Sequence, residues 1–442
     1  MKPTRLFPAL LIAVILAMMI LPAEAEREPI PELLRIRQQT KVMPESRNKR
    51  KISRAYPDTA NPAVNNAIAK MVDRLAVEAE KRLPREVSYN ALADTGATVY
   101  VSGTKTASFL VLAHTDAERE HIWSGFETAV FDLKTGKRLT LDDLFDAAAD
   151  ETISSAVREQ LNAYFPDEKA NRTNLERICR EIRQAPFTLS PAYLQLHYSA
   201  SDLYPGKTTL MHVRIPYRLL TEYMTEYARE ELDNSNYLLA ALTFDDGPGR
   251  GVTANILDTL RSWCAMGTFF NLGRPMGNAH DYVAWEHDAG HAVQSHTYTH
   301  TDRLNDKKVM FKEKERFAKE QAAIIGIPPA YMRAPGGNDK LYAKYEIGMP
   351  IVRWTTLSGD AVDTQTAEKV DFASNMVHTL KETSVILLHN IAQHSVRAAD
   401  SILSRLYQRG YMCVTVDELF EIRGMPMQDN IIYFGDEADQ RE

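Results

Sequence analysis

The 442-residue chain has few cysteines, no strong net charge and no long apolar run beyond its first residues. Cys179, Cys264 and Cys413 make no disulfide framework; Cys264 and Cys413 stand in apolar stretches typical of small core residues, and one disulfide among the three stays open. A net charge of −7 gives no electrostatic footprint for nucleic acid. Hydrophobic residues at 44% and charged residues at 25% are typical of a soluble globular protein.

The first residues have the pattern of an export signal. Lys2 and Arg5 precede an apolar run over 6–21, and the small residues of 22–25 follow it. This order predicts a signal peptide over residues 1–25 that is cleaved after Ala25. A retained membrane anchor is the alternative, although the run is short for a bilayer span. Both interpretations put the protein outside the cytoplasm, as a periplasmic, wall-associated or extracellular protein.

A basic segment follows, and we expect residues 26–51 to be a linker. Its positive charge fits a solvated linker or a weak tether to anionic lipid or wall polymer. The basic residues are Arg35, Arg37, Lys41, Arg47, Lys49, Arg50, Lys51 and, just beyond, Arg54.

Residues 52–230 mix predicted strands and helices without regular alternation, which predicts a small α+β domain. Strand-like runs lie at 98–101, 108–113, 128–133, 193–198 and 209–215, and helical stretches at 61–83, 150–164 and 172–184. The polar residues 230–236 mark its end.

From residue 237 to 424 strands and helices alternate, which predicts an α/β domain with parallel strands and crossover helices. The expected strands are 238–244, 267–271, 351–355, 385–388 and 412–416, and the expected helices are 252–264, 305–325 and 395–408. In such folds active sites gather at the carboxyl ends of the strands. Residues 425–442 are expected to be a C-terminal tail.

Two motifs in this second region favour a metal site. Asp245 and Asp246 end a predicted strand, where successive side chains point to opposite faces. One carboxylate can then bind a metal while the other moves a proton. His296 and His300, at i and i+4, lie on one face if the segment is helical and can bind the same ion. Together the two motifs suggest a metal-assisted hydrolase.

Three further motifs carry charged side chains close to predicted strands. They are Met332-Arg333-Ala334-Pro335-Gly336-Gly337, Trp354-Thr355-Thr356-Leu357-Ser358-Gly359-Asp360 and Leu387-Leu388-His389-Asn390. Alone, an Asp-Asp pair is often a turn or cap, and a pair of histidines is often an ordinary surface or core pair. Their joint occurrence favours one site.

The five motifs, in this order, resemble the polysaccharide deacetylase family over roughly residues 237–424. The resemblance implies a distorted (β/α) barrel and the removal of an acetyl group from a sugar amide or ester. It also implies one divalent metal ion, most commonly Zn²⁺, with Co²⁺ or another divalent ion as the alternative.

By that resemblance Asp246, His296 and His300 are the metal ligands, which leaves coordination positions open for water and substrate. Asp245 matches the general base that takes a proton from water. Arg333 matches the arginine that orients this base, and its planar fork suits a bidentate contact with a carboxylate.

The resemblance extends to the acid half of the site. His389 matches the general acid, and Asp360 matches the carboxylate that holds it. The N–H of Gly336 matches the oxyanion donor, and Leu387 lines the pocket for the acetyl methyl. Gly336 and Ala361 replace aromatic residues that the family often has, so substrate preference is open while every catalytic group is present.

A second resemblance covers the preceding domain, through residues 130–137, 139–145, 187–190, 204–206 and 215–217. It is similar to the extracellular domain of lysozyme-sensing anti-sigma factors, a module also fused to some peptidoglycan deacetylases. The combination favours a cell-wall glycan as substrate, and a spacer without a ligand is the equal alternative for this domain.

We therefore predict an exported N-deacetylase of amino-sugar polymers, most of all peptidoglycan, with membrane contact only if residues 1–25 are retained. An O-acetyl esterase of the xylan type would use the same site. An iron oxygenase shares the ligand types, but the adjacent Asp245 and the proton-transferring residues oppose it. A catalytically silent wall-binding or lysozyme-sensing protein is opposed by the complete catalytic set.

Overall fold

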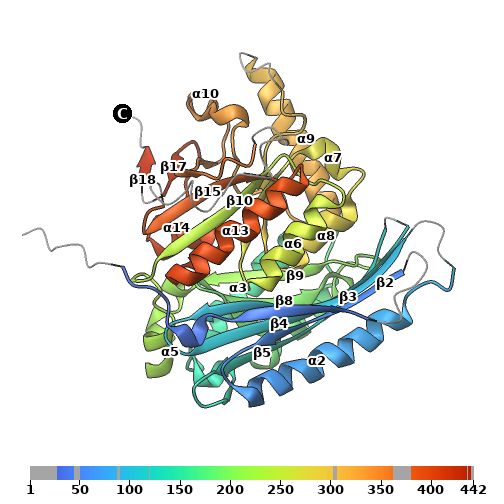
Figure 1. Ribbon diagram of the computed structural model, residues 1–442, viewed down its shortest axis with the longest axis vertical. Coiled ribbons are helices and arrows are strands. Elements are labelled where there is room, and N and C mark those ends of the chain that lie inside the picture. Colours follow the sequence, from blue (N-terminus) through green and yellow to red (C-terminus); the bar gives the residue numbers. More distant parts are fainter. Residues whose placement is uncertain are drawn as a thin grey trace, which may run out of the picture.

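The computed structural model describes residues 27–43, 50–86, 90–118, 120–301, 306–361, 380–435 and 437–439 (Figure 1). The expected signal segment, residues 1–25, lies outside this part of the chain. No helix within the described ranges combines the length and the apolar character that crossing a bilayer requires. The architecture is α/β, with a sheet covered by one long helix below and a parallel sheet covered by several helices above (Figure 1).

Six strands of the N-terminal part form one sheet in the order β1-β2-β3-β4-β5-β6. They are β1 (Arg37–Val42), β2 (Arg50–Asp58), β3 (Ala91–Ser102), β4 (Thr106–Ala117), β5 (Glu120–Asp132) and β6 (Arg138–Leu139). Because β2 and β3 are parallel, the chain crosses between them through helix α2 (Pro62–Lys81), which covers one face of the sheet (Figure 1). This confirms the predicted helix and the three predicted strands of this region.

Part of the expected basic linker is a folded edge of this sheet. Strand β1 and the first residues of β2 fall within residues 26–51, and their polar side chains make specific contacts. Gln38 exchanges two hydrogen bonds with the backbone of Ala97, and the guanidinium of Arg37 lies 3.2 Å from the ring centroid of Trp263. These contacts order a segment whose composition alone predicts solvation.

A smaller antiparallel sheet, in the order β7-β8-β9, completes the N-terminal part. Its strands are β7 (Phe187–Leu189), β8 (Tyr193–Ser199) and β9 (Leu210–Pro216), and it packs with α3 (Ala149–Ala163) and α4 (Arg172–Arg180) in one apolar core. The predicted strands 193–198 and 209–215 are confirmed. The predicted helix 172–184 is α4 followed by a separate 3₁₀ turn at Ile182–Gln184.

The C-terminal part is built on parallel strands in the order β12-β11-β10-β15-β14, and β16 also pairs with β10. They are β10 (Leu239–Asp245), β11 (Gly267–Asn271), β12 (Ala292–Ser295), β14 (Thr356–Leu357), β15 (Thr383–His389) and β16 (Met412–Cys413). Helices α6 (Val252–Ser262) and α13 (Gln393–Arg409) lie side by side on β10 and β15 (Figure 1). Helices α8 (His280–Asp288) and α9 (Lys307–Ile325) pack on Val293 of β12, at the edge of the sheet.

Strand pairing, together with one chain connection, links the two edges of this sheet into a ring. Met332 bridges Ser295 of β12 and Ile351 of β13 (Ile351–Val352), and the chain continues directly from β13 to β14, which pairs with β15. The expected strand 412–416 is shorter because α14 (Val416–Ile422) begins within it. The ring brings the carboxyl ends of distant strands to one edge of the fold.

The expected C-terminal tail also contributes strands. Within residues 425–442, β17 (Ile432–Phe434) pairs in parallel with β13, and β18 (Glu437–Asp439) pairs with β17. Ile432 is buried in the same apolar cluster as Ile351, so burial of the β17 side chains explains why this segment is ordered.

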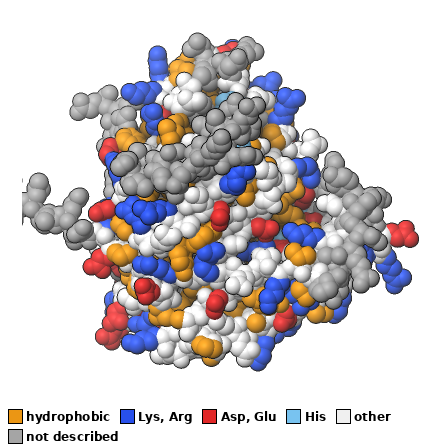
Figure 2. All heavy atoms as spheres, viewed as in Figure 1, with side chains coloured by type: hydrophobic (Ala, Val, Ile, Leu, Met, Phe, Trp, Pro, Cys, Tyr) orange, Lys and Arg blue, Asp and Glu red, His pale blue; other side chains and the backbone are white. Residues whose placement is uncertain are grey.

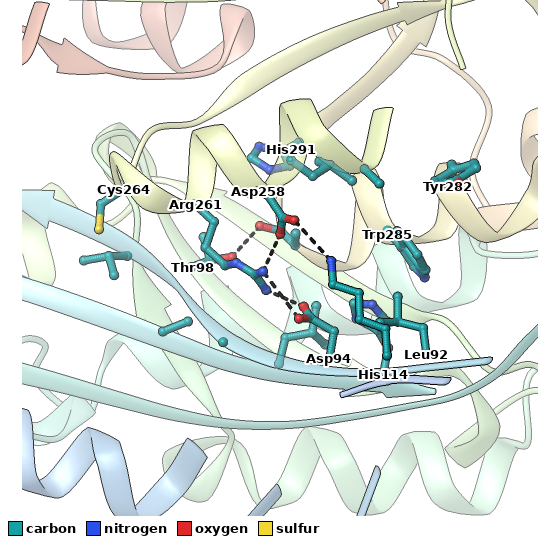
Figure 3. A pocket seen from close by; sticks show the side chains of 18 of the residues that line it. Leu92, Asp94, Thr98, His114, Asp258, Arg261, Cys264, Tyr282, Trp285 and His291 are labelled. Carbon is teal, nitrogen blue, oxygen red and sulfur yellow. Dashed lines mark hydrogen bonds and ion pairs between the residues drawn. The ribbon is translucent and has the colours of Figure 1, made fainter. Parts of the chain in front are cut away.

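The two parts of the chain share an apolar core and enclose a cavity. One buried cluster joins residues of α2 and β4 with residues of β10, β15 and α14. Beside it, a cavity of about 450 Å³ lies between β3 and helices α6 and α8, crossed by the ion pairs of Arg261 with Asp94 and Asp258 (Figure 3). None of the residues predicted for the catalytic site lines it. On the face in Figure 2 acidic and basic side chains are interspersed.

All three cysteines lie in described segments and are free. Cys179 is buried, and Cys264 and Cys413 are partly exposed. Burial raises the pKa of the Cys264 and Cys413 thiols to about 12. They therefore stay protonated and pack as small apolar side chains, in agreement with the sequence-based expectation.

Candidate active site and metal centre

Asp245 and Asp246 lie where β10 ends. Asp245 is its last residue, is buried, and lies opposite His389 of β15 in the strand register. The N–H of Asn390 donates to the carbonyl oxygen of Asp245 at 2.7 Å, which fixes the strand end. Asp246 has a φ of +68°, so the backbone turns directly after the strand.

The segment from His296 to His300 is a loop, so the helix expected for this pair is wrong. It follows β12 directly, and Thr297 and His300 have φ values of +71° and +54°, which a right-handed helix excludes. The two rings still converge, with centroids 5.1 Å apart. A tight loop, and not a helical turn, therefore brings the two imidazoles together.

Asp246, His296 and His300 form a three-residue group. Oδ1 of Asp246 lies 3.6 Å from Nε2 of His296 and 3.8 Å from Nε2 of His300, and the candidate ligand atoms are all within 4.8 Å of one another. These separations are too long for hydrogen bonds. Ligand atoms that share one ion at about 2.0–2.2 Å in tetrahedral geometry lie about 3.3–3.6 Å apart. The donor set and spacing therefore fit one divalent transition ion with positions left open.

The neighbours of His296 hold its ring in the form that a metal binds. Its Nδ1 donates to the carbonyl oxygen of Arg333 at 2.9 Å, so the proton sits on Nδ1 and the lone pair of Nε2 faces Asp246. Burial, the largest effect, lowers the pKa of His296 despite the charges of Asp245 and Asp246. A neutral imidazole anchored through its second nitrogen is the usual metal-ligating arrangement.

Arg333 is fully buried and holds Asp245. Its Nη1 donates to Oδ1 of Asp245 at 2.9 Å and to Oγ1 of Thr243 at 2.6 Å, while Nε donates to the carbonyl oxygen of Val352 at 3.1 Å. The guanidinium therefore makes one hydrogen bond to Asp245 and not the bidentate contact that its shape allows. The other carboxylate oxygen, Oδ2, lies 3.9 Å from Nε2 of His296 and so faces the three-residue group.

His389 and Asp360 form a second charged pair at the carboxyl end of β15. Nδ1 of His389 donates to Oδ1 of Asp360 at 3.0 Å, and the backbone N–H of His389 donates to Oδ2 at 2.7 Å. Burial opposes a positive ring, but Asp360, together with the charges of Asp245 and Asp246, outweighs burial and raises the pKa of His389. The imidazole can therefore carry a proton near neutral pH, with Nε2–H directed away from Asp360.

Gly336 and Leu387 flank these groups. Gly336 lies in the 3₁₀ turn Pro335–Gly337, three residues after Arg333, with a φ of +61° that favours glycine. Leu387 lies two residues before His389 on β15, so the two side chains share one face of the strand. Their roles as oxyanion donor and methyl contact stay predictions.

Three residues that support the site were not predicted: Thr243, Ser358 and Glu313. Thr243 accepts from Arg333, and the Ser358 hydroxyl donates to Oδ1 of Asp360 at 2.9 Å. Oε2 of Glu313 accepts from the backbone N–H of Thr299 at 2.6 Å and from its hydroxyl at 2.9 Å. Strand alternation could have found Thr243, which shares a face with the residue two positions on. No sequence signal connects Glu313 with the histidine loop.

Part of the chain is similar to known proteins. The family model described as polysaccharide deacetylase matches residues 234–347. The peptidoglycan-N-acetylglucosamine deacetylase PgdA of Listeria monocytogenes is 32% identical over 204 residues, which is 46% of this chain and 42% of that protein.

Two Bacillus proteins are also similar to part of the chain. The peptidoglycan-N-acetylmuramic acid deacetylase PdaC of Bacillus subtilis is 30% identical over 199 residues, 44% of this chain and 41% of PdaC. A peptidoglycan-N-acetylglucosamine deacetylase of Bacillus cereus is 32% identical over 204 residues, 42% of this chain and 72% of that protein.

The fold and the site define an α/β protein with a candidate mononuclear metal centre and flanking acid–base groups. With the family match and the extent of the Bacillus cereus alignment, the chain belongs to the polysaccharide deacetylase family. The chain spans about two fifths of the length of PgdA and of PdaC.

Proposed function

We propose that the protein is a metal-dependent deacetylase that hydrolyses N-acetyl groups of amino-sugar polymers, most of all peptidoglycan. The observation that carries the proposal is the convergence of Asp246, His296 and His300 between two held acid–base groups. Asp245 is fixed by Arg333 on one side, and His389 is fixed by Asp360 on the other. The names of the relatives support peptidoglycan as the substrate.

A divalent ion, Zn²⁺ in our proposal, would supply Lewis-acid polarisation of the acetyl carbonyl and of water. Asp245, held in place by the guanidinium of Arg333, takes a proton as the water oxygen bonds to the acetyl carbon. The N–H of Gly336 stabilises the developing oxyanion. His389 gives the Nε2 proton to the leaving nitrogen as the C–N bond breaks, which yields acetate and a free amine.

Asp360 makes this last step effective in two ways. Its Oδ1 accepts the Nδ1–H of His389, so Nε2 is turned toward the reacting atoms, and its charge keeps the ring protonated to higher pH. Ser358 donates to the same carboxylate oxygen and fixes its orientation.

An O-acetyl esterase of the xylan type is the alternative within the same site. Deacetylation of esters needs the same water activation, but an alkoxide is an easier leaving group than an amine and depends less on His389. We expect acetate release from purified peptidoglycan, with mass spectrometry of the muropeptides giving the deacetylated sugar. Release from acetylated xylan but not from peptidoglycan would overturn the assignment in favour of the esterase.

The remaining parts of the proposal concern domains and location. We propose that residues 237–424 form the deacetylase domain, a distorted (β/α) barrel, and that residues 52–230 form an accessory domain similar to that of lysozyme-sensing anti-sigma factors. We further propose an exported protein whose partner is cell-wall glycan. Export is tested by fusing the protein to a reporter enzyme that is active only outside the cytoplasm. We expect reporter activity, and a fusion protein that stays inactive in the cytoplasm would contradict export.

A further inference from the structure

A second group of potential metal ligands is buried between β9 and α8, away from the candidate active site. It consists of His212 of β9 and of His287 and Asp288 at the end of α8. All three side chains are buried, with Asp288 only 1% exposed, and their candidate ligand atoms lie within 4.8 Å of one another. The group contains none of the residues assigned to the deacetylase site.

The carboxylate of Asp288 is held by hydrogen bonds, and the imidazoles of His287 and His121 lie close to it. Oδ1 accepts the N–H of Leu210 at 2.9 Å, and Oδ2 accepts the hydroxyl of Ser124 at 2.7 Å. Its ion-pair contact within the described ranges is with Nδ1 of His287, 3.2 Å from Oδ1. Burying a carboxylate is costly unless a cation or a metal compensates it.

His212 is set up to offer a lone pair to the same point. Its Nε2 lies 3.1 Å from the carbonyl oxygen of His287, and its Nδ1 lies 2.8 Å from Nδ1 of His197. A neutral ring with its proton on Nε2 donates to the carbonyl oxygen.

The neighbouring histidine supports the other tautomer equally well. When the proton is on Nδ1 of His212, it can be donated to Nδ1 of His197, whose Nε2 then donates to Oγ1 of Thr188 at 2.8 Å. This frees Nε2 of His212 as a ligand without release of a proton. Anchoring of the second ring nitrogen is the usual environment of a metal-ligating histidine.

We propose that His212, His287 and Asp288 bind a second divalent transition ion, of the Zn²⁺ class, through Nε2, Nδ1 and Oδ1. Nε2 of His212 lies 3.1 Å from the carbonyl oxygen of His287, and Nδ1 of His287 lies 3.2 Å from Oδ1 of Asp288. These hydrogen-bonded atoms need to separate by only a few tenths of an ångström, to about 3.3–3.6 Å, to share one ion, with the carbonyl oxygen as a fourth donor. Two imidazoles and a carboxylate suit Zn²⁺ or a neighbouring ion.

A cavity lies near the proposed site without reaching its ligands, and a bound ion would have a structural consequence. A cavity of about 250 Å³ is lined by Thr209, next to Leu210, by Ala284, one turn before Asp288, and by His121, which contacts Ser124. The bound ion ties β9 of the N-terminal part to α8 of the α/β part. This inference goes beyond the proposed deacetylase activity and does not depend on it.

Metal stoichiometry tests the proposal directly. The full chain is stripped with a chelator, dialysed against micromolar Zn²⁺ and analysed by mass spectrometry for zinc per chain. We expect two ions in the wild type, one in Asp246→Ala/His300→Ala, and none when His212→Asn is added to that double variant. One ion in the wild type and none in the double variant would overturn the proposal, whether or not acetate is released.

A matched control separates loss of the site from loss of a buried histidine. His291→Asn removes a buried imidazole that contacts the N–H of Gly267 and is outside the group, so two ions are expected. If His212→Asn does not fold, the melting temperature of Asp246→Ala/His300→Ala decides. It should rise with added Zn²⁺, and no rise would count against the second site.

Discussion

The two pairs of acid–base groups show how neighbours give one residue type different duties. Asp245 contacts the buried guanidinium of Arg333 and keeps one oxygen toward the metal group. Both carboxylate oxygens of Asp360 accept hydrogen bonds from His389, so this carboxylate is less able to act as a base. Burial would raise the pKa of Asp360, but contacts with His389 and Ser358 outweigh it and lower that pKa.

We expect Asp360→Asn to move the alkaline limb of the pH profile of kcat to lower pH. Asp360 raises the pKa of His389, so its charge keeps the general acid protonated to higher pH, and its loss lets the proton leave earlier. A loss of general-acid catalysis costs roughly 10²–10⁴-fold in kcat. The measurement is the rate of acetate release from pH 5 to 10.

Ser358→Ala serves as the matched control for this prediction. It removes one hydrogen bond to Oδ1 of Asp360 but leaves the charge, so a smaller shift of the alkaline limb is expected. An alkaline limb that is unchanged in Asp360→Asn would contradict the role given to His389.

Thr243→Val tests whether the hydroxyl beneath the arginine orients the base. The substitution keeps the shape but leaves Nη1 of the buried Arg333 without its 2.6 Å acceptor. We expect roughly tenfold lower kcat with little change in KM, and a loss of about 1–3 kcal/mol in the free energy of unfolding. Thr243→Ser, which keeps the hydroxyl, should be near wild type, and equal behaviour of the two variants would contradict this role.

Most of these residues could be predicted from the sequence because they belong to motifs with fixed residue types and spacing. Asp245, Asp246 and His389 lie at strand ends, as their position after apolar runs predicts, and Asp360 lies three residues beyond β14. Thr243 belongs to the same motif as Asp245 and Asp246, and only the two carboxylates were predicted to have a role. Strand alternation places Thr243 on the same face as Asp245. The contact between Arg333 and Thr243 depends on how two distant segments pack, which no local pattern contains.

At the scale of the element, the histidine loop depends on a helix that follows it in the chain. Glu313 of α9 accepts two hydrogen bonds from Thr299, and His300 is the next residue. We expect Glu313→Gln to weaken Zn²⁺ binding at the deacetylase site roughly 10–100-fold, because second-layer contacts orient ligands. Competition with a chromogenic chelator measures it.

The control for Glu313 lies on the same helix. Glu315 is exposed and two residues away, so Glu315→Gln changes the charge of α9 equally but leaves the loop contact intact. If the two variants bind Zn²⁺ with equal affinity, the loss of negative charge on α9, and not the loss of the contact with Thr299, explains any weakening.

Periodicity predicted long elements well and short ones poorly. Helix α2 follows from apolar residues at helical spacing, a capping Asn61 and a proline at its start. The loop from His296 to His300 has a spacing that a helix and a tight turn satisfy equally, and the left-handed residues that decide are Thr297 and His300. Spacing alone cannot separate these two cases.

At the scale of the whole molecule, the N-terminal sheet and the α/β part are joined by partly buried ion pairs. Arg261 of α6 contacts Asp94 of β3, which also accepts from Ser53 (Figure 3). Burial would raise the pKa of Asp94, but Arg261, with smaller contributions from His114 and Ser53, holds it at about 2.

We expect Asp94→Asn to lower the free energy of unfolding at pH 7 by about 1.5–3 kcal/mol, because Arg261 loses one of its two carboxylate partners and keeps Asp258. The depressed pKa means that this stabilisation is complete above about pH 4 and is lost as pH falls toward 2. The difference between wild type and variant, measured by urea unfolding, should therefore shrink in acid.

An exposed ion pair provides the comparison. Arg74 and Glu127 interact on the surface with side chains 59% and 30% exposed, so Arg74→Met should cost less than about 1 kcal/mol. A similar small cost for Asp94→Asn would contradict the claim that the contact joins the two parts of the fold.

The junction itself was out of reach of the sequence. The basic residues 26–51 suggested a solvated segment, yet Arg37 and Gln38 are used in contacts with α6 and β3. The cavity between β3, α6 and α8 and the buried cluster of His212, His287 and Asp288 arise only when the two parts are packed together. The α/β part could be predicted because the alternation of strands and helices is visible along the chain and does not depend on how the two parts pack.

The most direct test of the central claim is the rate of acetate release from purified peptidoglycan by the chelator-treated full chain, before and after addition of Zn²⁺. The account predicts no release by the stripped protein, recovery with Zn²⁺, and no recovery in Asp246→Ala/His300→Ala. Release that is equally fast without metal, or recovery in the double variant, would contradict it.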